Sequence, residues 1–264
     1  MSVDFLKVIA QEKKEILSQK KAYYVNLKRN MRPANLTRYH MFKKAISKAG
    51  QINLIAEVKK ASPSVGLIRE DFEAVKIAKI YVDNHAAALS VLTEEKHFLG
   101  KPMYLRKVSE EFNVPTLMKD FIIDEDQIFE GAYCGASAIL LIVAMLDDVH
   151  LKDLTQVAHG LALDCLVEVH DEAEIDRAIK VGAEIIGVNN RNLKSLKVDI
   201  ANCLRMIPRI PKDKVIVAES GFKSHEDVKQ VRQAGANAVL IGETFMRADN
   251  IGAKIKEVMH GNTN

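Results

Sequence analysis

Ionisable and amide side chains stand at or near the ends of several short apolar segments of this chain. Ionised side chains are seldom buried unless they form pairs or take part in chemistry. Carboxylates and ammonium groups supply the proton acceptors and donors of general acid–base catalysis, and ammonium groups also hold anionic substrates. The side chains in question are Glu57, Lys59, Lys119, Glu168, Asn189 and Glu219.

Each of these residues also has a purely structural interpretation. Glu57 with Lys59, or Glu168 with Lys119, could form buried ion pairs without any function. The repetition of polar residues at the same end of five segments favours a shared site over isolated pairs.

The segments that must position these residues are aliphatic and lack polar alternation, which is typical of strands buried on both faces. Amphipathic segments such as 71–84, 171–182 and 224–235 lie between them and predict crossover helices. Ser224 followed by Asp227 predicts a capping box at the last of these helices. The expected strands are 52–58, 86–92, 114–119, 138–144, 165–169, 184–189, 215–219 and 238–242.

This alternation predicts an α/β fold with a parallel sheet, either closed as a barrel or open and doubly wound. An open dinucleotide-binding sheet should carry GxGxxG after an early strand, and no such motif follows 52–58 or 86–92. We therefore expect a (β/α)8 TIM barrel with an N-terminal helical extension. The prediction is one domain over residues 1–264, with the extension at 1–48 and the barrel at 49–260.

In such a barrel the strand ends form one rim, where barrel enzymes carry their catalytic groups. Side chains alternate along a strand, so Glu57 and Lys59 share a face, which lies inside the barrel if Val58 packs outward. Loops with Gly221 and Gly242 follow the last two strands, and each loop precedes a helix start, where backbone N–H groups favour a phosphate. Ordinary turn glycines are the alternative.

Composition limits the partners of the chain. Lys and Arg total 38 against 35 for Asp and Glu, so no nucleic-acid or membrane partner is required. The cysteines are too few and too widely spaced for a disulfide framework or a CxxC metal site. The first residues lack the continuous apolar stretch of a signal peptide, and no segment has the apolar length of a membrane span. We expect a cytoplasmic protein that is a monomer.

The expected extension is basic. The basic residues could form a solvated helical face, or they could steer an anionic substrate toward the barrel mouth that the extension is expected to cover. They are Lys13, Lys14, Lys20, Lys21, Lys28, Arg29, Arg32, Arg38, Lys43 and Lys44.

Six segments resemble those of indole-3-glycerol-phosphate synthases and occur in the order of that family. The combination of KxSPS with KDFIID is specific, whereas the NNRNL and AESG segments have counterparts in other phosphate-binding barrels. The segments are IAEVKKASPSVG (55–66), PTLMKDFIID (115–124), LVEVH (166–170), GVNNRNL (187–193), VAESGF (217–222) and LIGETFM (240–246).

The resemblance implies that 1-(2-carboxyphenylamino)-1-deoxyribulose 5-phosphate loses carbon dioxide and water to give indole-3-glycerol phosphate, with no metal or organic cofactor. It implies that Lys119 is the general acid of ring closure. Lys59 would hold the substrate carboxylate and donate a second proton in the dehydration, and Glu168 would be the general base. For proton exchange near neutrality we expect neighbouring cations or burial to lower the pKa of both lysines.

The resemblance also assigns supporting and binding positions. Glu57, Asn189 and Glu219 would orient the lysines and the sugar hydroxyls, and Arg191 would brace its loop. The phosphate would bind at Ser62, Ser220, Gly221, Gly242 and Glu243, the last through its backbone N–H with its side chain turned away. Apolar walls for the anthranilate ring are expected from Phe98, Phe121, Leu140 and Leu240, although an aromatic residue is more often plain core.

Two rival functions remain. Another phosphate-binding barrel, phosphoribosylanthranilate isomerase, is expected to use a Cys and Asp pair, and no cysteine here ends a predicted strand. A catalytically silent barrel could bind RNA or protein through its basic extension, but it would have no use for the inward charges.

Overall fold

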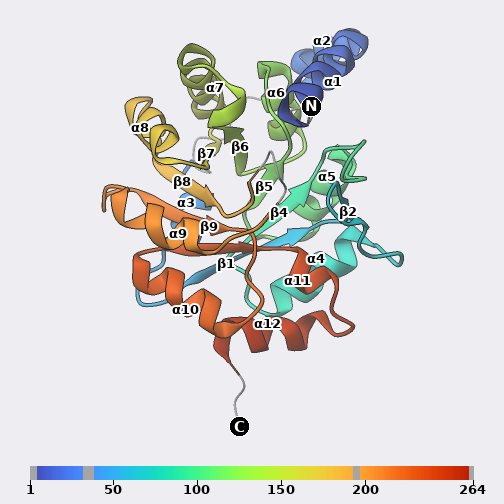
Figure 1. Ribbon diagram of the computed structural model, residues 1–264. Coiled ribbons are helices and arrows are strands. Elements are labelled where there is room, and N and C mark those ends of the chain that lie inside the picture. The colour runs from blue at the N-terminus through green and yellow to red at the C-terminus, as the bar shows by residue number, and fades with distance from the viewer. Residues whose placement is uncertain (1–4, 32–38, 193–196, 262–264) are drawn as a thin grey trace.

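The computed structural model describes residues 5–31, 39–192 and 197–261. Two basic residues of the extension, Arg32 and Arg38, and the last residue of the GVNNRNL segment, Leu193, lie outside these ranges. Parallel strands close into a barrel in the order β1-β10-β9-β8-β7-β6-β5-β4 (Figure 1). They are β1 (Asn53–Val58), β4 (Ala88–Leu92), β5 (Thr116–Lys119), β6 (Ala138–Ile142), β7 (Asp164–Val169), β8 (Ile185–Asn189), β9 (Val215–Glu219) and β10 (Ala238–Ile241). Each expected strand is present, and the predicted TIM barrel is confirmed.

Helices occupy the connections between the strands, as the amphipathic segments predict. At α10 the Ser224 hydroxyl accepts the Asp227 N–H at 3.3 Å, and the Asp227 carboxylate accepts the Ser224 N–H at 2.8 Å, which confirms the capping box. The helices after β1 are α4 (Ala74–Asp83), α5 (Pro102–Glu111), α6 (Glu125–Tyr133), α7 (Asp148–Gly160), α8 (Glu172–Lys180), α9 (Ala201–Met206), α10 (His225–Ala234), α11 (Glu243–Met246) and α12 (Ile251–His260), with 3-10 turns η2 (Val143–Met145) and η3 (Ile207–Arg209). A short hairpin that the sequence does not predict, β2 (Ala61–Ser62) with β3 (Gly66–Leu67), stands in the loop after β1.

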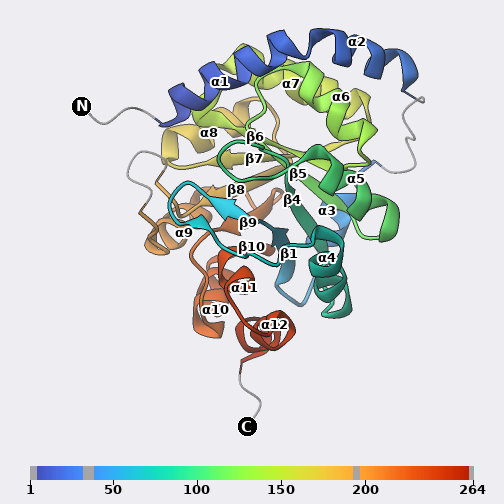
Figure 2. The same ribbon diagram turned by 90° about the vertical axis from the view of Figure 1, so that its right-hand side faces the viewer.

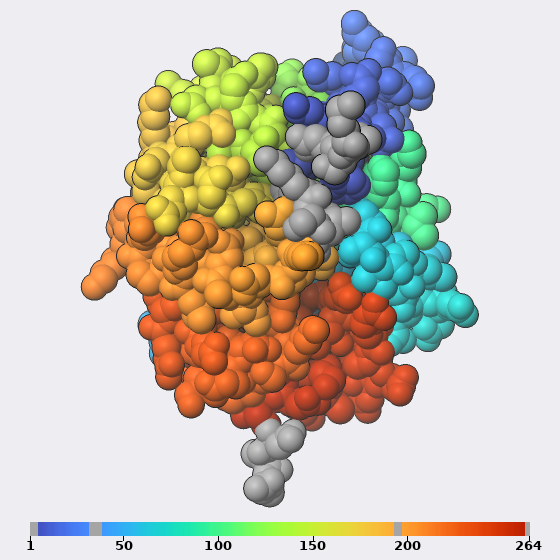
Figure 3. Space-filling view, in the orientation of Figure 1, coloured from blue at the N-terminus to red at the C-terminus, as the bar shows by residue number. Residues whose placement is uncertain are grey.

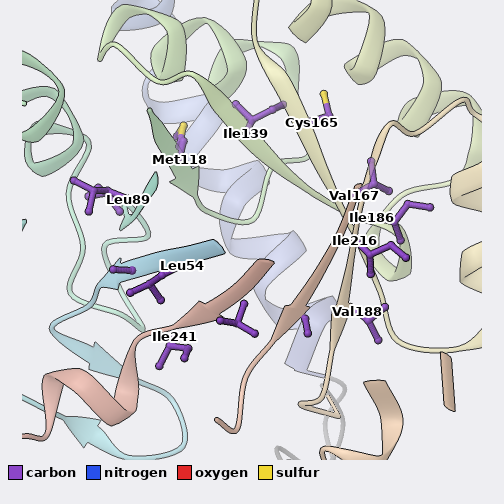
Figure 4. Packing of buried hydrophobic residues seen from close by; sticks show 14 of the residues in the cluster. Leu54, Leu89, Met118, Ile139, Cys165, Val167, Ile186, Val188, Ile216 and Ile241 are labelled. Carbon is purple, nitrogen blue, oxygen red and sulfur yellow. The ribbon is translucent and has the colours of Figure 1, made fainter. Parts of the chain in front are cut away.

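Alternation along each strand divides the core into two layers. Leu54 and Val58 of β1 point outward and pack under the helices, together with side chains of the other strands such as Ile139 and Ile186 (Figure 4). Ile55 points inward and joins the apolar interior of the barrel. Burying a large aliphatic side chain contributes about 1.5–3 kcal/mol, so these layers hold the cylinder in shape. The inward position after Ile55 on β1 is Glu57, where the interior changes from apolar to charged.

The N-terminal extension is helical, as predicted, and consists of α1 (Phe5–Gln19), α2 (Lys21–Asn30) and α3 (Met41–Ile46). Helices α1 and α2 lie beside α6 (Figures 1 and 2), and their blue atoms form the upper right of the space-filling view (Figure 3). Ile9 of α1 joins the interior cluster. Helix α3 lies at the opposite end, where Phe42 and Ile46 are fully buried beneath the strand starts. The extension contacts both ends of the barrel, whereas the sequence predicts that it lies over one mouth.

Several basic residues of the extension are paired with carboxylates of the barrel. The ammonium of Lys28 lies 2.7 Å from Glu125 in α6, and that of Lys43 lies 2.7 Å from Glu184 before β8. These two lysines therefore form partly exposed ion pairs with the barrel, whereas Lys14 and Lys44 are exposed. Among the helices of the described ranges, none is long and apolar enough to cross a membrane.

The most buried of these pairs joins α1 to the end of β5. Lys13 Nζ lies 2.5 Å from Asp120 Oδ1, and their side chains are 10% and 5% exposed. Asp120 also accepts hydrogen bonds from the Thr93 hydroxyl at 2.7 Å and from the Phe121 N–H at 2.8 Å. Asp120 directly follows Lys119, so this network fixes the backbone beside one of the predicted catalytic residues.

Replacing Lys13 should destabilise the protein strongly. In Lys13→Met the buried Asp120 carboxylate loses its cation, and loss of one partner of a buried pair costs about 3 kcal/mol. Urea unfolding measures the change as a lower midpoint. Lys14→Met, an exposed position on the same helix, is the matched control and should change stability by less than about 0.5 kcal/mol. Equal midpoints for the two variants would contradict this role of Lys13.

Candidate active site

A cavity of about 990 Å³ opens at the carboxyl ends of the strands. Ser62 is the one predicted site residue that does not line it. The predicted residues in its wall are Glu57, Lys59, Phe98, Lys119, Phe121, Leu140, Glu168, Asn189, Arg191, Glu219, Ser220, Gly221, Leu240, Gly242 and Glu243. The polar strand ends therefore meet in one space.

Lys119, the last residue of β5, lies between two carboxylates. Its ammonium is 3.0 Å from Glu168 Oε2 of β7 and 3.1 Å from Glu219 Oε2 of β9. Burial alone would lower the pKa of Lys119, but Glu168, Glu219 and Glu57 outweigh burial and raise that pKa above its usual value. The expectation of a lowered pKa is wrong for Lys119, because its nearest neighbours are anions.

Glu168 contacts a second cation that the site prediction missed. Its Oε1 lies 3.1 Å from His170 Nε2, a contact of opposite charges outside hydrogen-bond alignment. Burial of the carboxyl group would raise the pKa of Glu168, but Lys119 and His170 hold it well below its usual range. The sequence could have indicated His170, because side chains two positions apart along a strand point to the same face, and His170 lies two positions after Glu168.

Glu219 differs electrostatically from Glu168. Its side chain is 1% exposed, and its Oε1 has no hydrogen-bond partner among the described residues. Burial raises the pKa of Glu219, and repulsion by Glu168 raises it further against the opposing attraction of Lys119. Of the two carboxylates that contact Lys119, Glu219 therefore accepts a proton more readily than Glu168.

Lys59 and Glu57 form a second ion pair at the carboxyl end of β1. Their charged atoms are 2.5 Å apart, and the side chains are 11% and 7% exposed. The backbone of Gly242, after β10, lies directly against this pair, so a Cβ there would overlap the Glu57 carboxylate. A glycine at 242 thus makes room for an inward carboxylate on the neighbouring strand.

Arg191 joins loops that follow different strands. Its guanidinium donates to Ser64 Oγ at 3.2 Å and to Glu243 Oε2 at 3.4 Å. Glu243 Oε1 in turn lies 3.1 Å from Arg247 Nε. Ser64, which lines the cavity, lies two residues after Ser62, and their hydroxyls are 3.3 Å apart.

Part of the cavity wall is apolar. The rings of Phe98 and Phe121 have centroids 6.0 Å apart, and Phe5 of α1 meets Phe121 edge-on at 6.3 Å. The buried carboxylate of Glu94 accepts the N–H groups of His97 at 2.7 Å and Phe98 at 3.0 Å, which shapes the loop that carries Phe98. Neither Phe5 nor Glu94 was a predicted site residue.

Taken together, the cavity offers ammonium donors, ionised carboxylates, an apolar wall and glycine loops in one partly dry space. Such a set suits acid–base chemistry on an aromatic anion. In the portion of the chain that the structure describes, no group of His, Cys, Asp and Glu could hold a metal ion. Fold and site therefore define a TIM-barrel enzyme of the acid–base type.

Comparisons with known proteins identify the family. The family profile described as indole-3-glycerol phosphate synthase matches residues 6–258. The indole-3-glycerol phosphate synthase of Acetivibrio thermocellus is 54% identical over 213 residues, covering 81% of this chain and 82% of that protein. The enzyme of the same name from Endomicrobium trichonymphae is 46% identical over 249 residues, covering 94% and 93%. The chain belongs to the indole-3-glycerol phosphate synthase family.

Solved structures at low identity share the fold alone. The 3-hexulose-6-phosphate synthase of Salmonella typhimurium is 16% identical with a TM-score of 0.63, covering 79% of this chain and 97% of that one. Thiamine phosphate pyrophosphorylase of Pyrococcus furiosus is 13% identical with a TM-score of 0.57, covering 78% and 93%. Both likenesses support the barrel.

The close packing of Gly187 against Glu219 provides a test of the site geometry. A Cβ at Gly187 would overlap Glu219 Oε1 and crowd Leu166, so Gly187→Ala should displace the carboxylate from Lys119. We expect a loss of about 1–3 kcal/mol in stability and at least a tenfold lower kcat. Gly160→Ala, at the end of α7 with nothing within 4 Å of its added Cβ, should keep full activity. Equal kcat values for the two variants would disprove the constraint.

Proposed function

We propose that this chain catalyses the ring closure, decarboxylation and dehydration of 1-(2-carboxyphenylamino)-1-deoxyribulose 5-phosphate to indole-3-glycerol phosphate. The observation that carries the proposal is the Lys119 ammonium, held 3.0 Å and 3.1 Å from two buried carboxylates at the mouth of the barrel. The family membership of residues 6–258 supports the same reaction.

The substrate is proposed to span the cavity. Its anthranilate ring would lie against Phe98 and Phe121, because a flat aromatic group needs apolar walls. Its phosphate would face the backbone N–H groups at Gly221 and Gly242, as expected for the loops after the last two strands of such barrels. The Glu243 carboxylate is already paired with Arg191 and Arg247, which supports a side chain turned away from the phosphate.

In the first step the ring carbon that bears the carboxylate attacks the ketone carbon, and Lys119 gives a proton to the ketone oxygen. Lys59 holds the substrate carboxylate until it leaves as carbon dioxide. The electron pair of the broken bond restores the aromatic ring. The raised pKa of Lys119 keeps it protonated at neutral pH, and the developing alkoxide is a stronger base than an amine, so the proton transfer is favourable.

In the second step the new hydroxyl leaves as water. Lys59 donates the proton that the departing oxygen needs, and Glu168 removes a proton from the adjacent carbon of the new ring. The lowered pKa of Glu168 keeps its carboxylate ionised, without a bound proton, at neutral pH before this step begins. Glu57, Asn189 and Glu219 would orient the lysines and the sugar hydroxyls.

We further infer that the enzyme works as a single domain over residues 1–264, without a cofactor, as a cytoplasmic monomer that binds neither nucleic acid nor membranes. The near balance of 38 basic and 35 acidic residues supports the part of this inference that concerns nucleic acid and membranes.

The chain contains no Trp, so an indole product would fluoresce against a weak protein background. Incubation with the anilino ribulose phosphate should therefore produce an indole signal and one carbon dioxide per product. Absence of the signal, or retention of RNA that survives high salt, would contradict the proposed reaction.

Lys119→Met should abolish turnover while much of the substrate binding remains, because the lost ammonium acts mainly on the transition state. Single-turnover fluorescence measures the chemistry, and titration with the product measures binding. Lys107→Met, an exposed position on α5, is the matched control and should behave as the unaltered enzyme. Wild-type turnover in Lys119→Met would show that another group is the acid.

A further inference from the structure

His170 lies just beyond β7, between two carboxylates. Its Nε2 is 3.1 Å from Glu168 Oε1, and its Nδ1 is 3.1 Å from Glu174 Oε2. Its own backbone N–H also donates to Glu174 Oε2 at 2.7 Å. The side chain is 14% exposed, so water screens these contacts little.

Local structure holds Glu174 in this position. Asp171 caps α8 by accepting the Glu174 N–H at 2.9 Å, which places Glu174 in the first turn, facing back toward His170. The carbonyl of His170 accepts the Asn202 side chain of α9 at 3.4 Å. The ring therefore contacts residues of β7 and α8, and α9 contacts the backbone of His170.

Each ring nitrogen lies 3.1 Å from an anionic oxygen, with Nδ1 in a hydrogen bond to Glu174 and Nε2 beside Glu168 outside hydrogen-bond alignment. A neutral imidazole has one N–H and one lone pair, and a lone pair directed at a carboxylate is repelled. Burial disfavours the charged ring, but Glu168 and Glu174 outweigh burial and raise the pKa of His170 to about 10. The chemistry of its neighbours thus makes His170 an imidazolium.

We propose that His170 is a positioning residue of the reaction, a permanent cation that holds the Glu168 carboxylate oriented and ionised while Lys119 exchanges its proton. The inference rests on the proposed role of Glu168 as general base. The charged groups that face this pair are Lys119 on Glu168 Oε2, Glu174 on His170 Nδ1, and Glu219, which shares Lys119.

The need for such a cation follows from the ring-closure step. When Lys119 gives its proton to the substrate, it becomes a neutral amine, and Glu168 at 2% exposure would be left as a buried charge without a partner. His170 contacts the other carboxylate oxygen and gives up no proton. Glu168 therefore remains an anion that is ready for the dehydration.

Nitrogen NMR of the histidine-labelled full-length protein tests the protonation state without any substrate. The His170 signals are assigned by their loss in His170→Asn, or by their shift in Glu174→Gln if the first variant does not fold. We expect both nitrogens to remain protonated at pH 8. Titration of His170 near its ordinary pKa of about 6.5 would overturn the proposal, whatever reaction the enzyme catalyses.

The pH profile of kcat/KM tests the link to Glu168. Glu168 must be ionised to act as a base, so activity falls as pH drops through its pKa. Loss of the nearby positive charge in His170→Asn should raise that pKa and move the acidic limb upward by at least about one pH unit. A purely structural role would lower activity without moving the limb.

His150→Asn is the matched control, because His150 on α7 is largely exposed and pairs only with Asp147 among the described residues. Its acidic limb should stay in place. An unmoved limb in an active His170→Asn enzyme would disprove the positioning role while the proposed reaction stands. Absence of indole product from the unaltered enzyme would instead refute the reaction, and the NMR result would still decide the charge of His170.

Discussion

The site depends on one electrostatic constraint, the sharing of the Lys119 ammonium by two carboxylates in a nearly dry interior. Glu168 and Glu219 are 2% and 1% exposed, so neither carboxylate can rely on water for stabilisation. A single cation does not balance two anions. The structure resolves this in two ways, since His170 supplies a second positive charge to Glu168, and burial raises the pKa of Glu219 toward protonation.

The surrounding structure keeps this arrangement in place. Apolar side chains fill the lower part of the barrel, and α3 closes that end, so the charged residues are confined to the opposite rim. Helix α1 fixes the backbone next to Lys119 through the pair of Lys13 with Asp120. Glycines at 187 and 242 leave space for carboxylates of neighbouring strands. Packing inside the barrel and at its ends thus determines where the inner charges meet.

Much of this was predictable from sequence because it depends on local patterns. Strands buried on both faces are aliphatic throughout, and their polar last residues mark the rim. The sequence could not show which side chains of different strands and helices contact one another. The direction of the Lys119 pKa shift depends on carboxylates from β7 and β9. The positions of α1 and α3 at different ends of the barrel depend on which barrel residues the apolar face of each helix packs against. The β2–β3 hairpin is too short to leave a periodic signal.

A crystal structure with the alcohol analogue of the substrate, in which the ketone is reduced, tests the central claim most directly. The account predicts the alcohol oxygen within hydrogen-bond distance, about 3 Å, of Lys119 Nζ, the ring against Phe98 and Phe121, and the phosphate at the Gly221 and Gly242 loops. An analogue bound with its alcohol oxygen far from Lys119, or with its phosphate at the other end of the cavity, would contradict the account.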